Sequence, residues 1–179
     1  MKKLAVVVVA MGLLAGCGTP GGLVASDLGS SQNATLIAST SKKVAGFDKQ
    51  AFESGLSAGM SKAKTIYRTQ NTNNVSYDYG YAVGLIQGSL NSFARINGSF
   101  NVSEWRSLTY MNRKAMEDAL NALQKNPELA SKQAVAIGML QGGISSFDSI
   151  SGTFGTAQWK AFAYSNERVL KNVLAELTK

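Results

Sequence analysis

An internal repeat constrains the fold of this chain more than any other feature of its sequence. When the sequence is shifted by 54 residues, residues 81–125 align with residues 135–179 without a gap, and 15 of the 45 pairs are identical. The identical pairs include the two tryptophans of the chain, Trp105 and Trp159. We therefore interpret the two segments as copies of one structural unit that pack against each other.

Each copy has the pattern of a helical hairpin. In its second half, apolar residues recur at the spacing of one helix face: Trp105, Leu108, Met116, Ala119, Leu120 and Leu123 in the first copy, and Trp159, Phe162, Leu170, Val173, Leu174 and Leu177 in the second. The first half of each copy is apolar on most of its circumference, as expected for a buried helix. A leading helix is predicted over residues 43–68, and no segment alternates with the period of a strand.

The predicted fold is therefore all-α, with about five helices: two duplicated hairpins plus the leading helix, in a bundle with pseudo-twofold symmetry. Asn126-Pro127-Glu128 is expected to open a further helical segment, since proline suits the first turn of a helix. Gly98 and Gly152 suit a left-handed backbone at the end of a helix, and Ser103 or Thr156 is expected to cap the start of the next one.

Small residues recur at intervals of four in three of the predicted helices. Each glycine inside a helix costs about 1 kcal/mol relative to alanine, so another interaction must offset this cost. Close approach between helix backbones is the known use of this spacing. We therefore predict that seven glycines pack helices tightly together: Gly55, Gly59, Gly80, Gly84, Gly88, Gly138 and Gly142. The alternative is an amphipathic segment that enters a lipid interface or self-associates.

Four polar residues at equivalent positions of the two copies are candidates for a polar core or a ligand-facing site. Gln87 and Gln141 border the glycine faces, where an amide can bond a neighbouring backbone. Asn112 and Asn166 fall in the middle of the apolar stripes, and a buried amide without a partner costs roughly 1–3 kcal/mol. Either the two asparagines form a satisfied pair that fixes helix register, or they are the polar end of an internal ligand cavity.

The start of the chain has the pattern of an export signal. Lys2 and Lys3 precede an apolar run over residues 4–14, which is too short to span a bilayer but typical of a secretory signal. The run ends in Leu14-Ala15-Gly16-Cys17, which resembles the lipobox of bacterial lipoproteins. The resemblance implies a diacylglycerol on the Cys17 thiol and an N-acyl chain such as palmitate, and no other cofactor is expected.

This resemblance divides the chain into three parts. Residues 1–16 are the expected signal peptide, residues 17–41 the acylated cysteine with a flexible tether rich in small residues, and residues 42–179 the helical domain. In such lipoproteins an aspartate directly after the acylated cysteine favours retention at the inner membrane. This position holds Gly18, which implies an outer-membrane lipoprotein that faces the periplasm. The net charge of +7 is scattered along the chain, so we interpret it as a solvated surface and expect no nucleic-acid partner.

Composition excludes several classes of catalytic site. The chain has no histidine and one cysteine, which excludes the common zinc sites, Ser-His-Asp and Cys-His catalysis, and an intramolecular disulfide. Carboxylates in the repeated units are not shared between the copies; Glu104, for example, aligns with Gln158 and Glu117 with Lys171. We therefore expect no catalysis and no metal site.

The leading hypothesis is a membrane-anchored adaptor or assembly subunit of the cell envelope that binds another envelope protein or itself. The alternative is a carrier or sensor of a small apolar ligand held in a cavity between the two hairpins. A periplasmic immunity or inhibitor protein is a further hypothesis, because the stretch Gly80-Tyr81-Ala82-Val83-Gly84 is similar to small all-helical immunity proteins that neutralise cell-wall toxins.

Overall fold

The computed structural model describes residues 46–62, 74–96 and 100–179, and all regular elements in these ranges are helical. The predicted all-α bundle is confirmed. The predicted signal peptide, Cys17, the predicted tether and Gly98 lie outside the described residues. The helices are α2 (Lys49–Lys62), α3 (Val75–Phe93), α4 (Val102–Gln124), α5 (Pro127–Lys132), α6 (Ala134–Ser145), the 3₁₀ turn η1 (Ser146–Ser149) and α7 (Thr156–Thr178).

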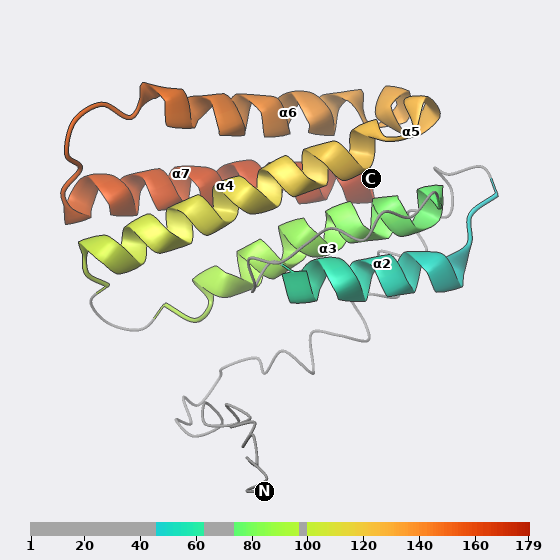
Figure 1. Ribbon diagram of the computed structural model, residues 1–179, viewed down its shortest axis with the longest axis horizontal. Coiled ribbons are helices and arrows are strands. Elements are labelled where there is room, and N and C mark those ends of the chain that lie inside the picture. The colour runs from blue at the N-terminus through green and yellow to red at the C-terminus, as the bar shows by residue number, and fades with distance from the viewer. Residues whose placement is uncertain (1–45, 63–73, 97–99) are drawn as a thin grey trace, which may run out of the picture.

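The helices are stacked so that α2 and α6 lie at opposite edges of the bundle, with α3, α4 and α7 between them (Figure 1). Helix α3 packs against α4 and α7, and α6 packs against α7 and α4. The first helix of each copy thus contacts the second helix of both copies. Helix α2 packs on the outer side of α3, whereas α6 is the outermost helix on its own side (Figure 1).

The two repeat units form antiparallel hairpins, α3 with α4 and α6 with α7 (Figure 1). Helices α2 and α3, in contrast, run parallel to each other. The backbone N–H of Asp48 donates to Ser76 Oγ at 3.0 Å, which joins the start of α2 to the start of α3. None of the helices in the described ranges has the length and apolar character needed to span a membrane.

The helix ends follow local sequence signals, but the expected caps were wrong. Helix α4 is capped by Asn101, whose side chain accepts from the Glu104 N–H at 3.0 Å while the Glu104 carboxylate accepts from Asn101 N–H. This reciprocal pair is a capping box. With Ser103 as the cap, the helix would have started two residues later. Helix α7 starts after Gly155 rather than with Thr156 as the cap. Gly152 does adopt the predicted left-handed backbone, with φ of +73°.

The segment opened by Asn126 is a separate short helix, α5, and not the start of α6. Asn126 Oδ1 accepts from the N–H groups of Glu128 and Leu129, with Pro127 in the first turn as expected. Gln133 then leaves helical geometry, with φ −107° and ψ 21°, and the chain changes direction before α6. The described ranges therefore contain six α-helices rather than five.

Equivalent aromatic side chains from the two copies contact each other where α4 and α7 meet. The rings of Trp105 and Tyr164 lie 5.6 Å apart, and those of Tyr110 and Trp159 lie 5.8 Å apart, both at an interplanar angle of 50°. Because Trp105 is equivalent to Trp159 and Tyr110 to Tyr164, the two contacts are reciprocal. Aromatic pairs of this kind each contribute about 0.5–1.5 kcal/mol beyond the area they bury, so the two copies are held together directly.

Candidate functional site

Four of the predicted glycines lie in the contact between α2 and α3. At Gly55, Gly59, Gly80 and Gly84 an added Cβ would lie less than 3.0 Å from a backbone carbonyl oxygen of the facing helix, closer than real Cβ atoms come. The missing Cβ has the direction of a glycine Cα–H bond. That bond therefore points at the carbonyl oxygen, as in the Cα–H···O contacts that recur at helix–helix interfaces.

The α2–α3 contact pairs one row of small residues with another, in register. Gly55 faces the backbone of Tyr77 and Tyr81, and Gly80 faces that of Phe52 and Leu56. One turn further along both helices, Gly59 and Gly84 repeat the arrangement. Gly88, one more turn along α3, is also buried. Helix α2 can approach α3 this closely only because both helices have glycines, which lack a side chain, along their line of contact.

The prediction that Gly138 and Gly142 pack helices together in the second copy was wrong. Both are exposed, and a Cβ built on either glycine would meet nothing within 4 Å. The physical reason is that no helix of the described ranges takes the place beside α6 that α2 takes beside α3. The glycine of α6 that does pack inward is Gly143, whose Cβ position lies near the side chains of Met116 and Val169.

Helix α6 therefore leaves a smooth and uncharged face exposed. Its exposed residues are Ala134, Val135, Gly138, Gln141, Gly142 and Ser145. Val135 is 56% exposed, the most of any large apolar side chain in the described ranges. No charged residue lies between Lys132 and Asp148. Single exposed apolar residues are normal on a protein surface, but here Val135 lies on the same face as two exposed glycines, in a stretch without charge. We name these six residues the α6 face.

The two predicted glutamines do not form a shared polar site. Gln87 is half-buried on α3, and its Nε2 donates to Asn91 Oδ1 at 3.0 Å within the same helix, not to a neighbouring backbone. Gln141 is exposed on the α6 face, so a position in a polar core was wrong for it, while a ligand-facing role stays a prediction. The difference follows from the missing cover over α6.

Asn112 and Asn166 are buried as the apolar stripes predicted, with 0% and 1% of their surfaces exposed. Neither Nδ2 nor Oδ1 of Asn112 has a hydrogen-bond partner among the described residues, and the same holds for Nδ2 of Asn166. The first alternative, a fully satisfied pair, was therefore wrong, and the polar end of an internal ligand cavity stays a prediction. Buried amide atoms without partners cost about 1–3 kcal/mol per group.

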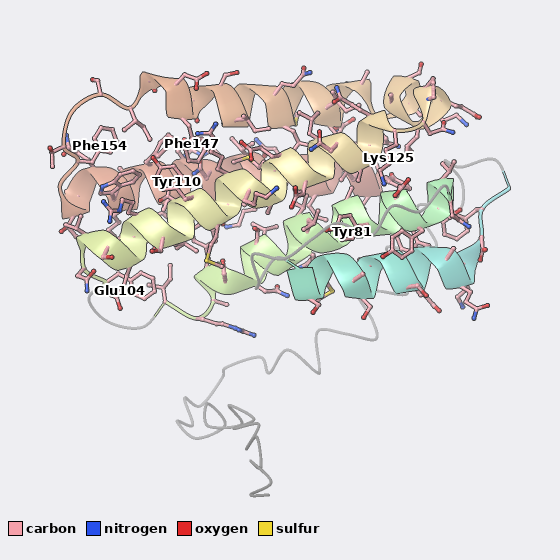
Figure 2. All side chains as sticks on the ribbon, viewed as in Figure 1. Tyr81, Glu104, Tyr110, Lys125, Phe147 and Phe154 are labelled. Atoms are coloured by element: carbon pink, nitrogen blue, oxygen red, sulfur yellow. The ribbon has the colours of Figure 1, made fainter. Side chains whose placement is uncertain are left out.

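A polar cluster between α3 and α4 was missed by the sequence analysis. Lys125, at the end of α4, forms a 3.0 Å ion pair with the buried carboxylate of Asp78 in the first turn of α3. The hydroxyl of Tyr81 is buried without a partner among the described residues. Figure 2 shows Tyr81 and Lys125 at the same end of the bundle. The first-turn position of Asp78 was the available signal, but its partner depends on how the hairpin closes.

Two buried tyrosines of α3, Tyr79 and Tyr81, predict instability at alkaline pH. Burial, reinforced by the charges of Asp118 and Tyr77, raises the pKa of Tyr81 from 10.0 to about 12, and burial alone raises the pKa of Tyr79 further. Above pH 10 the unfolded chain therefore binds fewer protons than the folded chain, and the free energy of unfolding falls as the pH rises through this window. Denaturant unfolding between pH 9 and about 12 should show this loss, and Tyr81→Phe should weaken it. An unchanged pH profile in the variant would contradict the assignment.

The aromatic side chains near the start of α7 and the carboxylates of the described residues give weaker evidence of a functional site than the α6 face. Figure 2 places Tyr110, Phe147 and Phe154 together near the start of α7; the rings of Tyr110 and Phe147, which belong to different copies, lie 5.8 Å apart. Among residues 46–62, 74–96 and 100–179, no three Cys, Asp or Glu side chains lie close enough to hold a metal ion.

The chain matches no protein-family model, no curated protein and no solved structure.

Proposed function

We propose that this chain is an exported lipoprotein, anchored through acylated Cys17 and facing the periplasm from the outer membrane, that acts without catalysis as a protein-binding adaptor or assembly subunit. The anchor rests on the lipobox-like Leu14-Ala15-Gly16-Cys17. Several acyl chains on one cysteine exceed the two signals that stable anchoring needs. The helical domain would be held close to its membrane by the tether.

The observation that carries the binding role is the α6 face. It combines the most exposed large apolar side chain of the described ranges, Val135, with two exposed glycines and no charge. Exposed glycines in a helix reduce its stability without packing to offset the loss. A protein partner that packs on Gly138 and Gly142 supplies that packing, and aqueous solvent does not.

Photo-crosslinking from this face tests the proposal directly. Gln141 is replaced by a photoreactive phenylalanine derivative in the full-length chain, expressed in its own cells. We expect a protein adduct after irradiation, because Gln141 lies beside both exposed glycines. The matched control places the same residue at Asn172, which is exposed on α7. Absence of an adduct at Gln141, or equal labelling from both positions, would contradict the proposal. An adduct with a cell-wall-degrading toxin would identify an immunity protein instead.

The lipid anchor has its own test. Cys17→Ser removes the thiol that accepts the diacylglycerol, so the precursor should retain residues 1–16 and lose its acyl chains. Intact mass and membrane fractionation measure both effects. Normal processing and membrane retention of this variant would overturn the lipoprotein assignment but leave the binding role of the α6 face in place.

One observation favours a carrier of a small ligand as a second candidate function. Asn112 is fully buried with both amide atoms unpartnered among the described residues. A bound molecule with one hydrogen-bonding group could satisfy these atoms while its apolar part packs between the hairpins. The effect of substituting Asn112 separates this candidate from the leading one.

A further inference from the structure

The two copies of the repeat differ in what covers their first helices. The alignment makes Gly84 equivalent to Gly138 and Gly88 equivalent to Gly142. In the first copy Gly84 packs against the backbone of α2, and Gly88 is buried. In the second copy the equivalent face of α6 is exposed. The first copy thus shows, within the same molecule, that residues in this arrangement accept a helix.

The covered copy also defines which kind of helix fits. Helix α2 runs parallel to α3 and contributes its own glycines, so that Gly55 and Gly80 share one level of the contact and Gly59 and Gly84 the next. A helix with a row of small residues spaced by four would therefore fit α6 in the way that α2 fits α3. Among the described helices, the rows of α2 and α3 are already buried against each other. The row that stays exposed is that of α6 itself.

We infer that the α6 face binds the α6 face of a second copy of this chain, with the two helices parallel and their rows Ala134, Gly138 and Gly142 in register. This inference names the partner within the proposed binding function and rests on it. Such a contact uses the same residues on both subunits, so it closes as a twofold dimer and does not propagate into a filament.

The charge and position of α6 agree with pairing to an identical helix. Because no charged residue lies between Lys132 and Asp148, two copies of this face do not repel each other. Helix α6 is also the outermost helix on its side of the bundle (Figure 1). Val135 is equivalent to Tyr81, which flanks the glycines in the α2–α3 contact. In a parallel dimer the two Val135 side chains would flank the shared glycine row from opposite subunits, near the twofold axis.

Disulfide trapping in native membranes tests this arrangement. Val135→Cys is introduced into the full-length chain and the membranes are treated with a mild oxidant. We expect a disulfide-linked species with twice the mass of the chain. Gly138→Leu in the same background should abolish it by forcing the helices apart. The matched control, Ala161→Leu on the exposed side of α7, should leave it intact. Asn172→Cys and the wild-type chain, which has only Cys17, should give no such species.

The outcomes separate this inference from the function on which it rests. A disulfide that forms with Val135→Cys and disappears with Gly138→Leu supports the dimer. Absence of the disulfide while Gln141 still crosslinks to another protein overturns the dimer and keeps the binding function. An adduct from Gln141 to another part of the same chain overturns the dimer as well, because that segment then covers α6. Absence of both signals overturns both proposals.

Discussion

Replacing Gly84 by leucine is expected to separate α2 from α3 and to lower the stability of the domain strongly. Even the Cβ of an alanine at this position would overlap the carbonyl oxygen of Leu56 and the backbone nitrogen of Met60. Backbone atoms cannot move aside as a flexible side chain can. Overpacking of this kind costs typically 1–3 kcal/mol and occasionally more, and we expect about 3 kcal/mol or more for Gly84→Ala.

The second copy supplies the matched control. Gly138 occupies the equivalent position, yet its added Cβ meets nothing within 4 Å, so Gly138→Ala should raise helix stability by up to about 1 kcal/mol. Thermal unfolding followed by circular dichroism at high dilution, where self-association is absent, compares the two variants. We expect melting temperatures that differ by on the order of 10 °C for a domain of this size. Equal melting of Gly84→Ala and Gly138→Ala would contradict the α2–α3 contact.

Replacing Asn112 by leucine is expected to stabilise the domain. The side chain is fully buried and neither of its amide atoms has a partner among the described residues. Removing an unsatisfied buried group recovers its desolvation cost of about 1–3 kcal/mol, and leucine has nearly the same shape. Denaturant unfolding measures the change. Asn166→Leu should act in the same direction with a smaller effect, because only Nδ2 of Asn166 is fully buried without a partner.

The same substitution separates the two candidate functions. If Asn112 binds a small ligand, the protein extracted from its membrane should carry that ligand, and Asn112→Leu should lose both the ligand and the stability that it provides. A decrease in stability together with a lost small-molecule mass would favour the carrier. An increase in stability without any such mass favours the adaptor.

The sequence predicted the parts of the fold that depend on patterns within one segment. The repeat and the helical stripes identified the all-α class, both hairpins and the burial of Asn112 and Asn166. The spacing of small residues also identified the glycines of α2 and α3 that pack together. These features need no knowledge of neighbouring elements, because helical periodicity fixes which residues share a face.

The predictions that failed depend on neighbours that the repeat does not contain. Gly84 and Gly138 are equivalent in sequence, but α2 packs beside the first helix of the first copy, and no described helix packs in this way on the first helix of the second copy. Equivalence within the repeat therefore did not imply an equivalent environment. Gln141 is exposed for the same reason. The Asp78–Lys125 ion pair joins two ends of a hairpin, and its two residues are 47 positions apart. No local pattern links them.

Native mass spectrometry of the full-length protein, extracted gently from its own membrane, tests most directly whether the domain binds protein through the α6 face. We predict two chains in one particle, each with its acyl anchor, and a single chain for the Gly138→Leu variant. A wild-type particle that contains one chain and no other protein would contradict it. An additional small-molecule mass on that single chain would instead support the ligand carrier.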